Sequence, residues 1–486
     1  MKKLLSNKVL LVFIFFALIF CSISLVNHYN FRTFALDLGM FNHAVYSLSQ
    51  FKMPIYTLDP SGIEMSFFAT HFSLITLLYA PFYYIFGSYT LLLIQIFAIL
   101  FGGLGIYKYA IHNFPNQRRL PLFILIHFFS IWGIYSALSF DFHNNVIGAM
   151  LVPWFVYHVE KRNFPYSCLY FLLILFSKEV EALWLSFILI GLMIKNYKSY
   201  RRSFLKFEIP LLATSLIYGI ILIGFIMPYL QGAENNLQLI RYKYLGDSLG
   251  EIIITLLTEP WRFYDILFTN TVNDTAYNYI KIETYVMMFM AGGFALFFRP
   301  AFLVMLIPIF AQKFLANNPV FWGINGQYSI EFVPIISLAL IAFITKLKKH
   351  QTPIILGLIA VSIGSTLITM KFRYSKWYDS INTQFYSRDH YAAIVDIKEV
   401  REALRIIDND DIISTSSCLA SHLANSDKIY HFPIVKDAKY IVLFKETIKP
   451  FPFSGEGYKK ELERVKNSGK FNILVDNKDL LILKKS

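Results

Sequence analysis

The chain has 486 residues, of which 56% are hydrophobic and 17% are aromatic. A globule in water cannot bury so much apolar surface, so the composition excludes a soluble protein. The formal net charge is +13, yet no exposed segment interleaves basic and aromatic residues, so nucleic acid is not an expected partner. Only three cysteines are present, and they do not form a disulfide framework.

The first predicted membrane segment is the apolar run 9–26, which is long enough to cross a bilayer. Lys2, Lys3 and Lys8 precede it and should stay in the cytoplasm, and no clear cleavage site follows, so we expect an uncleaved anchor. Asp37 then emerges on the outer side near the lipid headgroups, in the run LDLGMFNHAVYSL. An acid there can activate an acceptor for a donor whose lipid tail lies in the membrane. Alternatively, Asp37 caps the short amphipathic helix that follows it.

Ten further apolar runs bring the expected number of membrane segments to about eleven. They cover residues 89–107, 120–137, 146–159, 166–176, 182–194, 209–230, 285–298, 302–315, 332–345 and 353–370. The run 72–86 contains Pro81 and no charge at its far end. We therefore expect an interfacial or re-entrant helix there instead of a full span.

The basic residues between these runs predict the orientation in the plasma membrane. Seventeen lie on the predicted cytoplasmic side, against seven in the outer loops: Arg32, Lys52, Lys178, Arg241, Lys243, Arg262 and Lys281. This bias places the N-terminus inside and the C-terminus outside. Most acidic residues of the membrane region also fall outside, which suits an outward cleft that uses carboxylates. Longer outer loops that simply collect acids would explain the same asymmetry.

The outer loop 139–145, SFDFHNN, places an acid and a histidine between aromatic residues. Asp141 and His143 in such a tight loop suit a hydroxyl-rich or phosphorylated headgroup, or a divalent ion. Alternatively, the two side chains bond each other and cap the helix that follows.

Two further polar groups lie on the outer side. Glu64 and His71 follow Asp37 in the first outer loop, in the run EMSFFATHFS. Lys178 and Glu179 interrupt two short apolar runs, and a polar break at membrane depth is tolerated only where it lines a cavity or is buried in protein. A structural ion pair is the alternative for these two residues.

After Met370 the composition changes, and residues 371–486 predict a small extracytoplasmic α/β domain next to a membrane domain of residues 1–370, whose first outer loop is 28–88. This domain could gate a cleft, bind an acceptor or serve only as a structural cap. Expected helices cover 392–407, 419–425 and 457–469, and expected strands contain IISTSS, KIYHFP, AKYIVLF, FNILVD and LLILKK.

The order of DLGMF, THFSLITLLYAPFYYIFGSYTLLLIQ, FDFH and SKE resembles the domain of unknown function two-zero-seven-nine (DUF2079) family of predicted membrane proteins. YKYLG, RPAFLVMLIP, GQYS and SHLANSDKIYHFP fit the same family, so the resemblance covers nearly the whole chain. Leu74 departs from the pattern, since the family usually carries Pro there. The family in turn resembles the polyprenol-dependent glycosyltransferases of the C-type membrane fold, such as protein O-mannosyltransferases and aminoarabinose transferases.

That resemblance implies an α-helical polytopic membrane protein whose catalytic acid lies in the first outer loop, where Asp37 stands. The donor would be a lipid-linked sugar and the acceptor would be extracytoplasmic, with Asp37 as general base. A leaving lipid phosphate needs positive charge, and the outward candidates are Lys178, Arg241, Lys243 and Arg262. The other candidate substrate-binding residues are Glu64, His71, Asp141, His143, Glu179, Gln327 and Tyr328. Asp37, Asp141 and His143 are also candidate ligands of a divalent metal ion, and no other cofactor is expected.

A transporter or flippase of a lipid-linked or polar substrate is the alternative function, because transporters also use lysine and glutamate within the membrane. The sequence shows no inverted repeat and no paired Gly- or Pro-broken helices at matching positions, which are typical of transporters. A polysaccharide polymerase or ligase would share the lipid substrate, and the sequence separates it poorly from a transferase.

Overall fold

The computed structural model of the protein describes residues 7–232, 240–272, 274–446 and 450–486. Lys2 and Lys3, which contribute to the predicted orientation, lie outside the described residues. The chain divides into two compact units. The helical unit contains the chain up to Phe20 together with Ile96–Ser139 and Asn144–Gln384, and the mixed unit contains Cys21–Gln95, Phe140–His143 and Phe385–Ser486.

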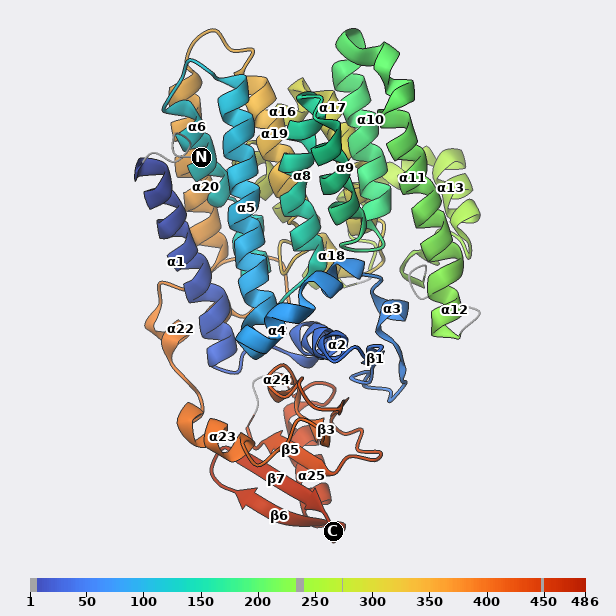
Figure 1. Cartoon of the computed structure of the whole chain (residues 1–486), viewed down its shortest axis with the longest axis vertical. Helices are drawn as coiled ribbons and strands as arrows, with labels where there is room; N and C mark the ends of the chain where they lie inside the picture. The colour runs from blue at the N-terminus through green and yellow to red at the C-terminus, as the bar shows by residue number, and fades with distance from the viewer. Residues whose placement is uncertain (1–6, 233–239, 273, 447–449) are drawn as a thin grey trace. The chain divides into compact units, whose positions relative to one another are not determined.

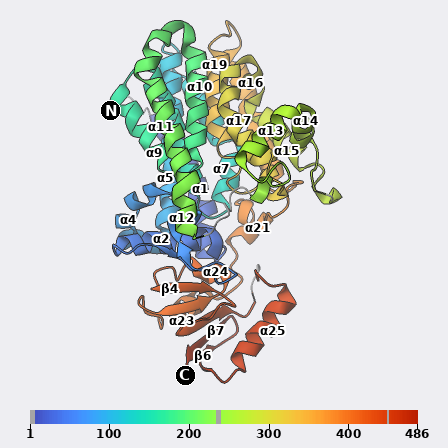
Figure 2. The same cartoon turned by 90° about the vertical axis from the view of Figure 1, so that its right-hand side faces the viewer.

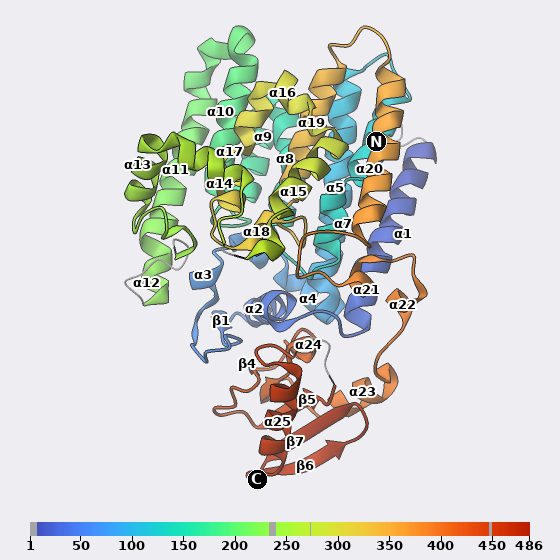
Figure 3. The same cartoon turned by 180° about the vertical axis from the view of Figure 1, so that it is seen from behind.

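The long helices α1 (Asn7–Tyr29) and α5 (Thr90–Asn113) each contribute to both units. Within the helical unit, α8, α9 and α10 pack side by side, and α17 packs against α10 (Figures 1 and 3). The α-helices of this unit are α6 (Leu120–Phe129), α7 (Trp132–Leu138), α8 (Asn144–Glu160), α9 (Phe164–Leu175), α10 (Glu181–Tyr200), α11 (Glu208–Ile221), α12 (Met227–Gln231), α13 (Leu249–Thr258), α14 (Pro260–Phe268), α15 (Ile280–Met288), α16 (Ala295–Phe298), α17 (Pro300–Phe314), α18 (Pro319–Trp322), α19 (Phe332–Ile344), α20 (Gln351–Thr369) and α21 (Ser380–Thr383).

Each of the eleven predicted membrane segments coincides with one of these helices or with a group of them. Four stretches of the described chain are long and apolar enough to cross a bilayer: Asn7–Tyr29, Ala80–Asn113, Glu208–Gln231 and Gln351–Thr369. The bent pair of α6 and α7 would make a fifth, and α9, α17 and α19 are shorter apolar helices. The chain thus has several membrane-type helices, and the count of about eleven spans stays a prediction.

The predicted segment 120–137 is bent by 43° where α6 meets α7. Ile131 takes an extended conformation there, which interrupts the helical hydrogen bonds. The carbonyl of Ser130 accepts a hydrogen bond of 2.9 Å from the Thr366 hydroxyl of α20. A neighbouring helix therefore satisfies the carbonyl at the break, as an apolar environment requires.

The predicted segment 285–298 is also broken. A π-helical turn, η8 (Phe289–Gly293), joins α15 to α16, and Gly292 has φ +91° inside it. Only glycine adopts this backbone conformation at little cost, so Gly292 permits the kink.

In the mixed unit, the chain from Cys21 to Gln95 forms short elements. They are η1 (Ala35–Gly39), α2 (Met40–Ser49), the antiparallel pair β1 (Ile55–Tyr56) and β2 (Met65–Ser66), α3 (Phe67–Thr70), η2 (Leu74–Leu78), α4 (Ala80–Phe86) and η3 (Gly87–Tyr89). The ambiguous run 72–86 is therefore a 3-10 turn followed by the seven-residue helix α4. Gly87, at φ +52°, ends α4, which alone is too short to cross a bilayer. Together with η3 and α5, α4 belongs to the apolar helical stretch Ala80–Asn113.

The C-terminal part of the mixed unit forms the expected α/β arrangement. Its five-stranded sheet has the order β4-β3-β5-β7-β6, with β3 parallel to β4 and β5, and β7 antiparallel to β5 and β6. Figure 2 shows the helix α25 alongside this sheet. The elements are α22 (Arg388–Tyr391), α23 (Ile397–Leu404), β3 (Ile412–Thr415), α24 (Ser417–Ala420), β4 (Lys428–His431), β5 (Tyr440–Phe444), α25 (Gly455–Lys466), β6 (Phe471–Asp476) and β7 (Leu480–Lys485).

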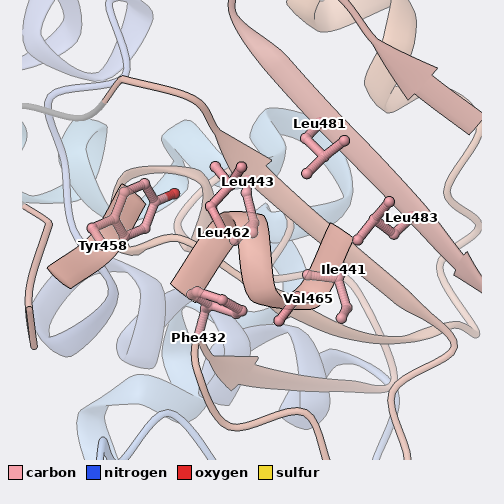
Figure 4. Close-up of a cluster of buried hydrophobic side chains, with 8 residues drawn as sticks. All are labelled: Phe432, Ile441, Leu443, Tyr458, Leu462, Val465, Leu481 and Leu483. Atoms are coloured by element: carbon pink, nitrogen blue, oxygen red, sulfur yellow. The ribbon is translucent and has the colours of Figure 1, made fainter. Parts of the chain in front are cut away.

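The core between α25 and the sheet follows from two residue periodicities. Leu443 pairs with Leu481 across the β5–β7 ladder, and Ile441 pairs with Leu483, so alternate strand residues point to the same face. On α25, Tyr458, Leu462 and Val465 recur at helical spacing and pack on these residues, as Figure 4 shows. The helix α25 thus covers one face of the sheet with its apolar side.

Candidate functional site

Asp37 lies in a π-helical turn that continues directly into α2. The residues at the N-termini of η1 and α2 are Phe34 and Gly39, and neither helix has a side-chain cap of its own. The alternative that Asp37 caps the following helix is therefore wrong. Its side chain is 29% exposed, so its carboxylate can reach solvent or a ligand.

The residue that caps this helical segment comes from the FDFH loop. Asp141 Oδ2 accepts hydrogen bonds from the backbone N–H groups of Phe34, at 2.8 Å, and Leu38, at 3.4 Å. A carboxylate at a helix N-terminus satisfies donors that the helix leaves unpaired and opposes the positive end of its dipole. Asp141 is only 4% exposed and has φ +51°, a conformation that Asp and Asn tolerate better than most residues.

A buried glutamine of α5 holds the same loop from the other side. The Gln95 side chain donates to the Asp141 carbonyl and accepts from the His143 backbone N–H, each at 3.0 Å. His143 stacks on Phe140, with the ring centroids 5.7 Å apart and the planes at 4°. In this position His143 Nε2 lies 3.8 Å from Asp37 Oδ1, within ion-pair distance. The sequence analysis did not identify Gln95, although a lone amide in an apolar run is a signal.

Aromatic contacts join the remaining motif of this region to the same group. Phe41 of α2 packs against Phe142 of the FDFH loop at 5.3 Å, and against His71 at 5.4 Å with near-parallel rings. The DLGMF, THFS and FDFH runs, which lie far apart in the sequence, thus meet in one unit. Asp37, Asp141, His143 and His71 belong to this candidate site.

Glu64 belongs to a different group of charges. Its carboxylate contacts Lys436 Nζ at 2.7 Å, Lys428 Nζ at 3.6 Å and the Tyr430 hydroxyl at 3.2 Å. The bond from Lys436 holds the pKa of Glu64 below its usual range, against the opposing effect of burial. These contacts hold the segment that carries Glu64 against β4 and the residues that follow it. They do not support the expected part of Glu64 in sugar or metal binding.

Within the described ranges, no group of three or more histidine, cysteine or acidic side chains is arranged to hold a metal ion. The expected divalent site of Asp37, Asp141 and His143 is therefore not supported. Asp141 directs one carboxylate oxygen to the backbone instead.

Tyr56 is a neighbour of Asp37 that the sequence did not single out. It lies in β1, and its side chain is partly buried. Burial, followed by the carboxylates of Asp59 and Asp37, raises the pKa of Tyr56. The phenol therefore stays protonated at neutral pH and offers a hydrogen-bond donor near Asp37.

The helical unit contains a second group of buried polar residues. Lys178 and Glu179 lie at the expected break between α9 and α10, and Lys178 and Lys313 both interact electrostatically with Glu331. Glu331 is 7% exposed, and its Oε1 accepts a 2.7 Å hydrogen bond from Asn145. Lys313 and Glu331 were not predicted as site residues from the sequence, although charged residues in or beside apolar membrane-type runs often mark functional sites.

The other candidate cations have local partners. Arg262 bonds Glu259 at 3.3 Å and the Tyr244 carbonyl at 3.1 Å, and the exposed Lys243 lies 3.7 Å from Asp247. The guanidinium of Arg241 lies 4.6 Å over the ring of Phe321.

Gln327 and Tyr328 lie in the turn before α19. Gln327 is 6% exposed, and the Tyr328 carbonyl accepts a hydrogen bond from Lys313 at 3.1 Å. The backbone of Tyr328 thus joins the buried polar group of the helical unit, whereas Gln327 is a buried residue beside it in the sequence.

Residues 27–481 match the model of a family described as predicted membrane protein (DUF2079). The chain belongs to this family. No curated protein matches the sequence. Among solved structures, the chain resembles ArnT from Cupriavidus metallidurans bound to undecaprenyl phosphate, with a TM-score of 0.53 and 10% identity over 99% of this chain and 98% of that one. The DUF2079 protein therefore has an ArnT-like fold.

Proposed function

We propose that this protein is a membrane glycosyltransferase that moves a sugar from a polyprenyl-phosphate-linked donor to an extracytoplasmic acceptor. The observation that carries the proposal is the placement of Asp37. Its partly exposed carboxylate lies 3.8 Å from His143 in a turn that Asp141 caps. Such a fixed carboxylate suits a general base, because a base must be held within reach of the proton it takes.

The likeness to ArnT supports the identity of the donor. That structure holds undecaprenyl phosphate, and a fold shared over nearly the whole chain provides a comparable scaffold. Fold alone does not determine the reaction, so the proposal depends on the site residues.

The proposed reaction is a direct displacement. Asp37 takes the proton of an acceptor hydroxyl or amine while the acceptor oxygen or nitrogen forms a bond to the anomeric carbon. The bond from that carbon to the phosphate oxygen of the lipid breaks, and the lipid phosphate leaves with the electron pair. His143, when protonated, stabilises the ionised carboxylate of Asp37.

Lys178 is the strongest candidate to stabilise the leaving phosphate, because it is half-buried at the break between the apolar helices α9 and α10. Arg241, Lys243 and Arg262 are weaker candidates, because none of them interrupts two apolar runs as Lys178 does. We further propose that the chain crosses the plasma membrane about eleven times, as the apolar runs predict. The N-terminus would then be cytoplasmic and the domain after Met370 extracytoplasmic.

Replacement of Asp37 by Asn tests the proposal. Asn keeps the size and polarity of the side chain, but it cannot take a proton. We expect a folded, membrane-inserted protein whose transfer rate falls by about a hundredfold or more, the low end for loss of a general base. Purified protein would be supplied with a panel of polyprenyl-phosphate sugars and cell-envelope extract as the acceptor source, and released polyprenyl phosphate would be measured.

Asp59→Asn is the matched control. Asp59 lies in the same outer loop, and its Oδ1 accepts from the Ser61 backbone N–H at 2.8 Å, a bond that Asn can also accept. Activity of this variant should stay within about twofold of the wild type, as is usual for a surface change. Equal transfer rates for the Asp37→Asn variant and the wild type would remove Asp37 from the mechanism.

A further inference from the structure

A cavity of about 240 Å³ opens in the mixed unit, within residues that the proposed transfer reaction does not use. It lies between α23 with its following loop and the SHLANS run at 421–426. The lining residues are Phe31, Arg401, Leu404, Arg405, Ile407, Asp408, Asn409, His422, Leu423, Asn425 and Ser426. Its volume is below the range typical of drug-sized ligands and suits a group of monosaccharide size.

Two arginines supply positive charge to this cavity. The guanidinium of Arg401 lies 4.3 Å over the ring of Tyr29 and donates to the Tyr89 hydroxyl at 3.3 Å, so its position is fixed. Arg405 follows one helical turn later and is exposed. Across the parts of the chain that the structure describes, neither guanidinium lies within ion-pair distance of a carboxylate. Arginine in this situation has donors left for a planar or tetrahedral anion.

His422 adds a polar atom that needs a partner. Its ring stacks on His28 at 4.0 Å with the planes at 4°, and it also contacts Phe31 at 4.3 Å. Nε2 is inaccessible to solvent and has no hydrogen-bond partner within the described ranges of the chain. A buried polar atom without a partner is uncommon in native proteins, and the ring that carries this one lines the cavity.

The remaining lining adds groups that recognise hydroxyls and an apolar ring face. Asp408, Asn409 and Asn425 provide oxygen acceptors, while Phe31 and Leu423 provide apolar surface. Asp408 offsets part of the positive charge, so a bare anion gains less here than an anion that also carries hydroxyls.

We propose that this cavity binds an anionic sugar group, a monosaccharide that carries a phosphate or a carboxylate. Arg401 and Arg405 bind the anionic group, and the amide and carboxylate groups bind the sugar hydroxyls. This inference goes beyond the proposed transferase activity and does not depend on Asp37. It gives a role to the SHLANS run, whose residues His422, Leu423, Asn425 and Ser426 line the cavity.

Binding would be measured by titration calorimetry on the full chain in nanodiscs of phosphatidylcholine, so that no anionic lipid headgroup competes. The probes are glucose 6-phosphate, glucose and inorganic phosphate. We expect glucose 6-phosphate to bind at least tenfold more tightly than either of the other two. Equal binding of glucose would refute the role of the arginines, and equal binding of inorganic phosphate would refute the sugar site.

Arg405→Glu and Arg405→Gln are the test variants, because the Arg405 side chain is exposed and forms no ion pair among the residues that the structure describes. Both variants should weaken glucose 6-phosphate binding at least tenfold, and Arg405→Glu should weaken it more than Arg405→Gln. Lys398→Glu and Lys398→Gln are the controls. They make the same charge changes on an exposed residue of α23 that does not line the cavity, and they should change glucose 6-phosphate binding by less than twofold. Undiminished binding by either Arg405 variant would overturn the proposal. Asp37→Asn should bind the probe like the wild type, which separates this site from the transfer reaction.

Discussion

Replacement of Asp141 tests how the turn that carries Asp37 is held. Its buried carboxylate accepts from two backbone N–H groups, and its own backbone has φ +51°. Asn keeps an oxygen acceptor and tolerates the left-handed conformation, so Asp141→Asn loses only the charge and should lower the free energy of unfolding by about 1 kcal/mol. Gly adopts the left-handed conformation but leaves the two backbone donors unpaired, so Asp141→Gly should lower the free energy of unfolding by about 2 kcal/mol. Ala loses the acceptor and adds about 1 kcal/mol for the left-handed backbone, which gives about 3 kcal/mol.

The expected order of stability is therefore wild type, Asn, Gly and Ala. Thermal unfolding of the four proteins in identical nanodiscs, followed by intrinsic fluorescence, would measure the order. Transfer activity should follow it, because Asp37 is positioned by this cap. Asp410→Ala, at an exposed acid of the mixed unit, should change the midpoint little. An Ala variant that is as stable as the Asn variant would refute both the cap and the backbone strain.

Two further predictions concern the C-terminal part of the mixed unit. Leu462→Ala removes a buried side chain from the core under α25 and should lower the free energy of unfolding by about 2–5 kcal/mol. Limited proteolysis should then cut this variant faster within residues 385–486. Lys460→Ala, at an exposed position of the same helix, should be cut at the wild-type rate. Lys436 lowers the pKa of Glu64 in the folded protein, so this carboxylate stabilises the fold above its unfolded pKa of about 4.3 and loses that effect as pH falls through the folded value. The melting temperatures of the wild type and Glu64→Gln should therefore differ at pH 7 and converge below about pH 4. A difference in melting temperature that does not change with pH would contradict the pairing of Glu64 with Lys436.

The sequence by itself determined the parts of this protein that depend on local pattern. Apolar runs of the right length predicted the membrane-type helices, and short apolar runs between turn residues predicted the strands β3 to β7 and the helix α25. The motif order also identified the family, and it directed attention to Asp37, Asp141 and His143. These features were accessible because hydrophobic periodicity and short motifs are properties of neighbouring residues.

The tertiary structure decided which polar groups meet. A helix N-terminus accepts any suitably placed oxygen, and here Asp141, more than a hundred residues away, provides it in place of Asp37. Glu64 appeared in the sequence as a site residue near Asp37, but the fold pairs it with lysines beyond position 420. Gln95 stands out in the sequence only as an amide in an apolar run, because its contacts are with two backbone groups of a distant loop. Hydrogen bonds and ion pairs act over a few ångströms of space, and distance along the chain does not predict them.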